Sequence, residues 1–298
     1  MPMPYRFLTS LAVRHQGQLY LFDAGEGCQI TLKKAKLGIK SLRVVAVSHL
    51  HGDHCLGLPG LLMMRAQVPD PGPLTILGPP GIERLVSNLR ELLQFFINYS
   101  ISFVEWQEAS PETAYEDELV RIRWGPVRHT TLCLGYRFEE HPRPGKFRPE
   151  AAQALGLPPG PLWRKLQQGE KVTLEGGNTV SPHQVVGPPR TGRRICYAVD
   201  TRPDDFVYRL CQDVDVAFLD GMFLPEHAAE AEEKFHMTVE EAARVALVAG
   251  ALRAVLVHIS PRYGEEDLDK LAAAASQRFE KAEIGRDLQR YAVPYREG

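Results

Sequence analysis

The sequence predicts an α/β protein, folded as a four-layer αβ/βα sandwich in which two sheets pack face to face beneath outer helices. Two observations lead to this prediction. Short apolar runs rich in β-branched residues alternate with helical segments in the first third of the chain, and the alternation returns in the last third. A stretch dense in Pro and Gly lies between them. At 298 residues and 44% hydrophobic content, the chain can bury one large core or two small ones.

The first third supplies strands and helices in turn. Strands are expected near residues 11–14, at 19–22 and at 44–47, with helices at about 29–37, from about 57, and at 81–96. Further strand-like stretches follow around 101–105 and 119–123. The helix at 81–96 is amphipathic, which suits a helix that covers one face of a sheet.

The stretch from His141 to Pro189 has a different character, because its apolar residues keep no clean period. Composition favours a long loop or linker here. Loops of this length in compact domains are usually functional or mobile. We therefore expect one domain over residues 1–298 with a flexible arm inserted at about 141–189.

The last third returns to α/β alternation. The strand at 216–219 ends at Asp220, and a helix is expected at 225–234. Thr238 and Glu241 have capping-box spacing at the start of an Ala-rich helix that runs to Val248. A final helix is expected at about 266–279.

Composition indicates the cellular compartment of the protein and the class of partner that it can bind. The chain has no run of about 18 apolar residues, so we expect no membrane span, and its N-terminus lacks the pattern of a signal peptide. Five scattered cysteines without a Cys-x-x-Cys pair indicate reduced thiols in a cytoplasm. The net charge of −2 does not indicate a nucleic-acid binder, yet six Lys or Arg against two Glu lie between His141 and Lys171. Such a cluster could guide a phosphate backbone, and an ordinary solvated surface explains it equally well.

The most informative motif is Ser48-His49-Leu50-His51-Gly52-Asp53-His54, directly after a buried strand. Neutral imidazoles and a carboxylate are ligands for zinc and similar divalent ions. A turn after a strand can splay alternate side chains, so that His49 and His51 bind one ion while Asp53 and His54 reach a second. The motif predicts a metal site.

Three more candidate ligands follow apolar strands. His129 comes after the stretch 120–127, Asp200 ends the run 194–199, and His258 ends the run 254–257. Each alone is weak evidence, because a single histidine after a strand is more often a structural residue. Residues at strand ends can converge at one edge of a sheet, so the three positions together favour coordination.

These motifs resemble the metallo-β-lactamase superfamily and, within it, the ribonuclease Z family, which matures the 3′ end of transfer RNA. The sequences Asp200-Thr201-Arg202-Pro203 and His258-Ile259-Ser260-Pro261-Arg262-Tyr263 carry the narrower resemblance. Leu166-x-x-Gly169-Glu170-x-Val172 resembles the family's flexible arm, which grips the elbow of transfer RNA. The resemblance implies a metallo-β-lactamase fold, two zinc ions per subunit, a homodimer and a precursor transfer RNA substrate.

The resemblance also implies roles for particular residues. One zinc is expected on His49, His51 and His129, the other on Asp53, His54 and His258, with Asp200 bridging them. Asp53 is a candidate base as well as a ligand. His236, just before a helix, is the candidate acid for the leaving 3′-oxygen, with Asp220 as its partner where the family usually has Glu. The expected RNA contacts are Arg6, Gly160, Pro161, Arg164 and Lys165.

Three departures from the family stand out. The family's first strand and its Leu-Gly-Thr-Gly turn have no counterpart before Pro2, which implies either an earlier natural start or an incomplete sheet edge. The loop Pro-x-Lys-x-Arg-Asn, which senses a CCA end, keeps Pro2 and Arg6 but lacks its Lys and Asn. Ala198-Val199 replaces the usual Ser-Gly before the bridging aspartate.

The sequence is less consistent with three other functions. A phosphodiesterase for small molecules needs no remote arm, and a di-iron oxidoreductase usually has Glu where His51 stands. A non-catalytic RNA-binding module is disfavoured, because a relic site usually loses ligands. The sequence therefore favours a zinc-dependent endoribonuclease that removes the 3′ trailer from precursor transfer RNA.

Overall fold

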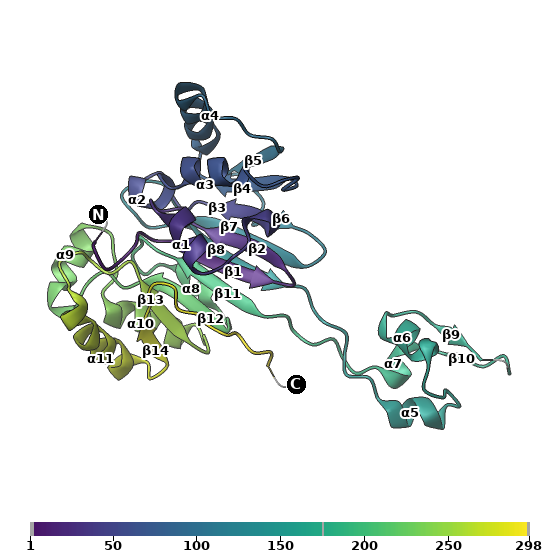
Figure 1. Ribbon diagram of the computed structural model, residues 1–298. Coiled ribbons are helices and arrows are strands. Elements are labelled where there is room, and N and C mark those ends of the chain that lie inside the picture. The colour runs from purple at the N-terminus through teal and green to yellow at the C-terminus, as the bar shows by residue number, and fades with distance from the viewer. Residues whose placement is uncertain (1–2, 175, 297–298) are drawn as a thin grey trace. The chain divides into compact units, whose positions relative to one another are not determined.

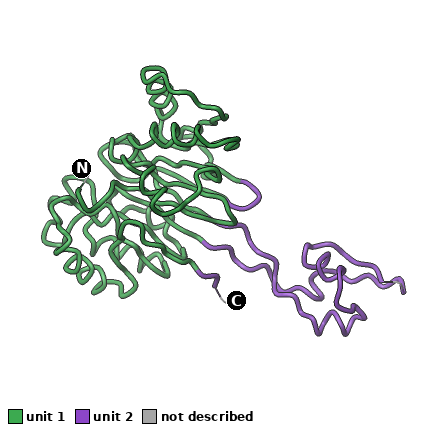
Figure 2. Tube along the Cα trace, in the orientation of Figure 1, with its two compact units in different colours: residues 1–116, 121–138, 194–293 green, residues 117–120, 139–193, 294–298 purple. Residues whose placement is uncertain are grey.

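The computed structural model describes residues 3–174 and 176–296. The chain divides into two compact units (Figure 2). Unit 1 comprises residues 1–116, 121–138 and 194–293, and unit 2 comprises residues 117–120, 139–193 and 294–298. The insertion expected at about 141–189 falls within unit 2.

Unit 1 contains two sheets flanked by helices (Figure 1). The first sheet has the order β1 (Leu11–His15), β2 (Gln18–Phe22), β3 (Leu42–Ala46), β4 (Leu74–Gly78), β5 (Ile101–Glu105). The second has the order β14 (Ala282–Ile284), β13 (Ala254–Val257), β12 (Val216–Asp220), β11 (Arg194–Ala198), β8 (Cys133–Glu140), β7 (Val120–Val127), β6 (Thr113–Glu116). In the first sheet β2 to β5 pair in parallel, and in the second sheet β11 to β14 do so.

Aromatic side chains join the inner faces of the two sheets. The ring of Tyr20 lies 5.2 Å from that of Phe138, and Phe22 lies 5.8 Å from Tyr136. The hydroxyl of Tyr136 donates to the carbonyl of Val47, at 2.7 Å. Because side chains alternate along a strand, the neighbours of Tyr20 and Phe22 point to the opposite, helix-covered face.

Separate apolar clusters lie under the helices on the two outer faces. Each cluster packs under its own group of helices. The cluster of the first sheet includes Leu19, Leu21 and Val45, and that of the second sheet includes Ala198, Leu219 and Leu256. The first group is α1 (Cys28–Lys34), η1 (Ile39–Ser41), α2 (Gly52–Cys55), α3 (Leu58–Arg65) and α4 (Ile82–Leu93). The second group is α8 (Asp205–Cys211), η2 (Pro225–His227), α9 (Ala228–Glu233), α10 (Val239–Val248), η3 (Glu265–Asp267) and α11 (Leu268–Arg278). Helix, sheet, sheet and helix make the predicted four layers.

Unit 2 corrects one prediction, since the Pro- and Gly-rich segment is not a structureless loop. It folds into α5 (Pro149–Ala154), α6 (Pro161–Gln167), β9 (Val172–Thr173), β10 (Thr179–Val180) and α7 (Pro182–Val185). Leu157, Leu166 and Val185 are fully buried in its small core, with Trp163 packed against them. Proline starts three of its helices at the position where a missing N–H costs nothing. The prolines therefore begin elements here instead of breaking them.

Several element boundaries also differ from the sequence prediction. The helix expected at 225–234 is split into η2 and α9, and the helix expected at 266–279 begins as η3. The strands β4 and β8 were not predicted: β4 is largely apolar and buried, without clear polar–apolar alternation, and β8 has charged residues, Arg137 and Glu140, that are buried in the fold. The capping box of Thr238 and Glu241 is confirmed. Within the described residues, no helix has both the length and the apolar character required to cross a bilayer.

Candidate metal centre

The metal motif occupies the turn that follows strand β3. Ser48 and His49 continue beyond the strand, and the short helix α2 presents Asp53 and His54 on its first turn. His49 and His54 are fully buried, whereas His51 is exposed. The turn therefore places two of its candidate ligands in the interior and one toward solvent.

The second sheet supplies the remaining candidates from its strand ends. His129 follows β7, Asp200 follows β11, Asp220 is the last residue of β12, and His258 follows β13. Because β11, β12 and β13 are parallel, their carboxyl ends lie at one edge of the sheet. This edge brings together residues that are far apart in the sequence.

Left-handed backbone turns the chain sharply after three strands: Asp23 directly follows β2, whereas Asp200 and His258 follow β11 and β13. Asp23, Asp200 and His258 have φ values of 56°, 51° and 59°. Asp is among the few non-glycine residues that adopt this conformation readily, and such positions cluster at functional sites. Each strand therefore ends at this turn, and the side chain of the turn residue is directed into the site.

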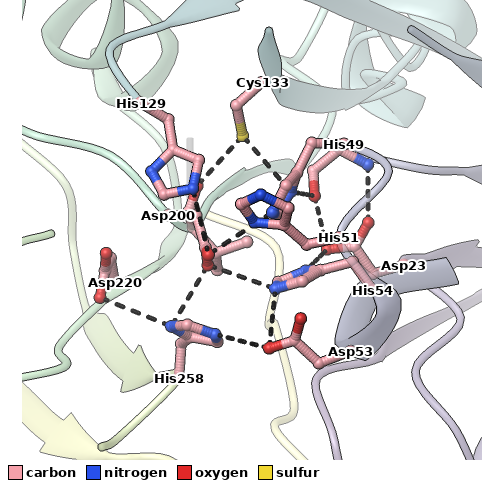
Figure 3. Close-up of polar contacts among 12 residues, drawn as sticks. Asp23, His49, His51, Asp53, His54, His129, Cys133, Asp200, Asp220 and His258 are labelled. Carbon is pink, nitrogen blue, oxygen red and sulfur yellow. Dashed lines mark hydrogen bonds and ion pairs between the residues drawn. The ribbon is translucent and has the colours of Figure 1, made fainter. Parts of the chain in front are cut away.

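Asp200 lies at the centre of the cluster (Figure 3). Its Oδ2 lies 3.6 Å from His49 Nε2 and 3.7 Å from His129 Nε2. Its Oδ1 lies 3.4 Å from His54 Nε2 and 3.2 Å from His258 Nδ1. The two oxygens of one carboxylate thus face two different sets of histidines.

Among the described residues, potential metal ligands form three overlapping groups. One contains His49, His51, His129 and Asp200, and a second contains Asp53, His54 and His258. The third joins Asp200 and His258 to Asp220 and His236, and the first two are the sets that the sequence predicted. The carboxylate of Asp53 closes the second set, with Oδ2 3.7 Å from His54 Nε2 and 3.6 Å from His258 Nε2. The structure therefore brings together all seven residues that the sequence proposed as ligands.

The donor atoms have the chemistry expected of a metal centre. Within the described part of the chain, five buried atoms here have no hydrogen-bond partner: His49 Nε2, His54 Nε2, His129 Nε2, His258 Nδ1 and Asp200 Oδ1. Buried polar atoms without partners are costly, and several of them aimed at one point indicate a bound ion. Nitrogen and carboxylate donors in this number fit a metal cofactor.

The electrostatics of the site agree with a cation there. Burial lowers the pKa of His49 to about 3, which keeps its imidazole neutral and able to bind a metal. Burial opposes protonation of His54 as well, but the carboxylates of Asp200 and Asp23 outweigh it and raise its pKa to about 10. Negative charge is therefore in excess around His54, and a bound cation can neutralise it in place of a proton.

Asp23 is a buried residue whose importance the sequence analysis did not recognise. Its Oδ2 accepts hydrogen bonds from the Tyr197 hydroxyl at 2.6 Å and the Ser48 hydroxyl at 2.8 Å, and lies 2.7 Å from His54 Nδ1. Its Oδ1 accepts from the Ser48 backbone N–H at 2.6 Å. A carboxylate on Nδ1 fixes the ring and leaves Nε2 free for a metal. The available signal was an aspartate directly after the buried strand 19–22.

His236 and Asp220 form a pair beside the ligand cluster. Nδ1 of His236 lies 2.8 Å from Asp220 Oδ2, and the two ring planes of His236 and His258 stack at 5.4 Å. Asp220 also accepts backbone N–H groups of Thr201 and Met222. Burial disfavours charge on His236, but Asp220 outweighs it and raises the pKa of the imidazole. The predicted contact between the two residues is present.

The proposed RNA-contacting residues occupy two separate places. Arg6, in unit 1, donates from Nη2 to the carbonyl of Ser260 at 3.1 Å, two residues beyond His258. The other four lie on or next to α6 in unit 2 and are all exposed: Gly160 and Pro161 at its start, and Arg164 and Lys165 in its last turn. Their exposure leaves them available to a partner.

Family models match two parts of the chain. A beta-lactamase superfamily domain matches residues 163–259, and the model of the anti-Pycsar protein Apyc1 matches residues 5–109. Ribonuclease Z of Treponema denticola is 41% identical over 298 residues, which cover 99% of this chain and 95% of that protein. Ribonuclease Z of Methanosarcina acetivorans is 40% identical over 296 residues, with the same coverage.

Solved structures agree on the fold. The short form of human tRNase Z aligns with a TM-score of 0.69 and 21% identity over 98% of this chain and 95% of that one. A long-form RNase Z from yeast aligns with a TM-score of 0.57 and 16% identity over 95% of this chain and 39% of that one. With the near-complete sequence relatives above, the chain belongs to the ribonuclease Z family of the metallo-β-lactamase superfamily.

Proposed function

We propose that the protein is an endoribonuclease that cleaves precursor transfer RNA on its 3′ side and leaves a 3′-hydroxyl. The observation that carries the proposal is the pair of ligand sets that face the two oxygens of the Asp200 carboxylate. The names of the full-length relatives supply the substrate class.

Two zinc ions per subunit are the proposed cofactors. His49, His51 and His129 would hold one, and Asp53, His54 and His258 the other, with Asp200 offering one oxygen to each. Imidazole and carboxylate donors suit zinc. When bound, two such cations activate water near neutral pH and stabilise the charge that develops on a phosphodiester.

Asp53 is proposed as the base. Its side chain is 33% exposed, which makes it the most open carboxylate among the ligands. The imidazole of His258, whose Nε2 lies 3.6 Å from Oδ2, is the main cause that holds the pKa of Asp53 below its ordinary value, so the group is ionised at neutral pH. An ionised and accessible carboxylate can take the proton of an attacking water.

His236 is proposed as the acid that protonates the leaving 3′-oxygen. Asp220 holds Nδ1, so Nε2 is the nitrogen left to face the substrate. The Asp220 carboxylate outweighs burial and raises the pKa of His236, which favours the protonated imidazole, the form that can donate. The stacked position against His258 puts this proton beside the ligand cluster.

Unit 2 is proposed to bind the body of the transfer RNA. On α6, Arg164 and Lys165 are exposed, whereas Leu162 and Leu166 pack into the small core. Folding of the unit therefore presents basic side chains on one face, where phosphates can reach them. Arg6 is proposed to contact the 3′ end of the substrate, because it lies against Ser260 near the metal ligands.

A homodimer is proposed from the apolar surface of α2 to α4. Six large apolar side chains are exposed between residues 50 and 96: Leu50, Leu56, Met63, Leu92, Leu93 and Phe96. Concentrated exposed apolar residues mark interaction surfaces. In analytical ultracentrifugation, Phe96→Glu should produce monomers, whereas Leu247→Glu on α10, equally an exposed apolar position, should not. A cytoplasmic location is proposed because all five cysteines are free and buried.

The deciding experiment is cleavage of an end-labelled precursor transfer RNA by the purified protein, with zinc, with chelator, and after zinc is restored. We expect cleavage to require metal and the 5′ product to accept ligation at a free 3′-hydroxyl. The variant His51→Ala should bind less zinc and lose cleavage. Cleavage of chromogenic diesters without cleavage of the RNA would instead indicate a phosphodiesterase for small molecules, and full activity in chelator would exclude the metal mechanism.

A further inference from the structure

We propose that Arg202 is a positioning residue for His236, because it fastens the turn that carries this imidazole to the loop that carries Asp200. The inference rests on the proposed function, in which His236 acts as the acid. Arg202 lies two residues after Asp200, and neither the metal ligands nor the acid pair account for it.

The guanidinium group of Arg202 reaches the backbone of His236 itself. Its Nη1 donates to the His236 carbonyl at 2.6 Å. The same group forms a bidentate pair with Glu241, at 2.9 Å and 2.6 Å, and its Nη2 lies 2.8 Å from Glu232 Oε2. Arg202 is only 7% exposed, so its contacts with His236 and Glu241 are largely shielded from water, whereas the side chain of Glu232 is 54% exposed.

The turn that carries His236 has a strained backbone that other contacts must stabilise. It connects α9 to α10, and Phe235 within it has a φ of 59°, in the left-handed region where a phenylalanine is strained. The N–H of His236 donates to the Ala231 carbonyl at 2.8 Å, so α9 fixes one side of the residue. Arg202 fixes its other side through the carbonyl.

Glu241 anchors Arg202 to the start of α10. Its Oε2 accepts from the backbone N–H of Thr238 at 2.9 Å as well as from Arg202. Thr238 and Glu241 form the capping box of the helix, two residues after His236. The end of the turn, the helix cap and the guanidinium are thus one hydrogen-bonded assembly.

Arg202 and its neighbour Thr201 also contact the surroundings of the candidate metal ligands. The Arg202 backbone N–H donates to the Arg128 carbonyl at 3.0 Å, next to His129. The Thr201 N–H donates to Asp220 Oδ2, the oxygen that holds the His236 ring. Residues 200–202 therefore contact the candidate metal ligands, the carboxylate of Asp220 and the backbone of His236. This arrangement sets the distance between the proton donor and Asp200.

An arginine is required for this task. Its planar fork serves several acceptors at once, whereas a lysine keeps the charge but presents a single nitrogen. The substitution Arg202→Lys should therefore release the His236 carbonyl or Glu241 while it retains charge and most of the buried stem. A displacement of about 1 Å of a reacting group can lower turnover by about 10²-fold.

The test compares two substrates that differ in their leaving group. In the zinc-loaded enzyme, Arg202→Lys should lower kcat on precursor transfer RNA by about 10- to 10²-fold with little change in KM. Hydrolysis of bis(p-nitrophenyl) phosphate, whose leaving group departs without protonation, should change less than about threefold. Zinc content should remain that of the unsubstituted protein.

A double-mutant cycle separates positioning of His236 from general destabilisation. In a His236→Ala background, Arg202→Lys should have little further effect on RNA cleavage, because the residue it positions is gone. The matched control is Arg137→Lys. Arg137 is also a buried arginine, 8% exposed, and donates to the carbonyls of Arg209, Leu210 and Gln212, away from His236. The control should lower the melting temperature without a difference between the two substrates.

Each outcome has a distinct meaning. Equal losses on both substrates, or an undiminished effect in the His236→Ala background, would overturn the role of Arg202. If His236→Ala itself shows no dependence on the leaving group, the proposed acid fails and the positioning role fails with it. If Arg202→Lys does not fold, Glu241→Gln removes the bidentate anchor instead and should give a milder form of the same pattern, and its absence would overturn the inference.

Discussion

Substitution of Asp23 by Asn should weaken metal binding, although Asp23 is not itself in either ligand set. The carboxylate accepts four hydrogen-bond contacts, from the Ser48 backbone and hydroxyl, the Tyr197 hydroxyl and His54 Nδ1. An amide has one acceptor oxygen in place of two, so it must direct its NH₂ group at one side of this network. If that group faces His54, Nδ1 becomes an acceptor and the proton moves to Nε2, the atom that points at Asp200.

The expected magnitude follows from these contacts. Loss of a partner that orients a metal-binding histidine typically costs about 10- to 100-fold in metal affinity, or about 1.4–2.7 kcal/mol. A buried donor left without its acceptor lowers the free energy of unfolding of the metal-free protein by about 1–3 kcal/mol. Asp23→Asn should therefore reduce both quantities.

The assay is competition for zinc between the protein and a chromogenic chelator, together with thermal unfolding of the metal-free protein. Tyr197→Phe is the control, because it removes one hydrogen bond to Asp23 Oδ2 and leaves His54 with its carboxylate. It should lower the melting temperature but change zinc affinity less than about threefold. Zinc affinity in Asp23→Asn equal to that of the control would refute the argument that Asp23 sets the tautomer of His54.

Three further predictions concern the acid, unit 2 and an ion pair. The substitution His236→Ala should lower turnover of precursor transfer RNA by about 10²–10⁴-fold, with normal zinc content and a smaller defect on a nitrophenyl diester; zinc loss would make His236 a ligand instead. Replacement of residues 149–184 by a short Gly-Ser linker is feasible because Phe147 and Val186 are bridge partners. It should spare nitrophenyl diester hydrolysis and weaken RNA binding in a filter-binding titration, whereas equal losses would place this segment in the catalytic core. Burial opposes charge on Glu241, but hydrogen bonds from Arg202 and Thr238 hold its pKa below the ordinary value. A depressed carboxylate pKa gives stability that is complete above the ordinary pKa and lost as pH falls through the folded value. In urea unfolding, the free energy of unfolding of Glu241→Gln should therefore be lower than that of the unsubstituted protein at pH 7, and the difference should shrink below about pH 4. A difference that stays constant with pH would contradict the assigned cause.

The sequence alone identified all seven candidate metal ligands, because each lies at or just beyond the end of a recognisable strand. His49 to His54 follow a clear apolar strand, and His129, Asp200 and His258 each end another one. A strand is recognisable from five residues, and the edge at which parallel strands end follows from their direction. The strands β5 and β13 were predicted with their observed bounds for the same reason.

Unit 2 shows where composition misleads. Its prolines and glycines resemble those of a loop, yet they start helices around buried Leu157, Leu166 and Val185. Those three residues are far apart in sequence and follow no common period. Only the tertiary structure shows that they meet in one core.

The tertiary structure alone decided how the site is supported. Nothing in the local sequence joins Asp23 to Tyr197, 174 positions away, or Arg202 to the carbonyl of His236. Periodicity reports which face of an element is buried, but a hydrogen bond between distant loops depends on how whole sheets pack. The sequence therefore indicated which atoms could bind metal. Packing determined which carboxylate contacts the ring of His54 and which guanidinium contacts the backbone of His236.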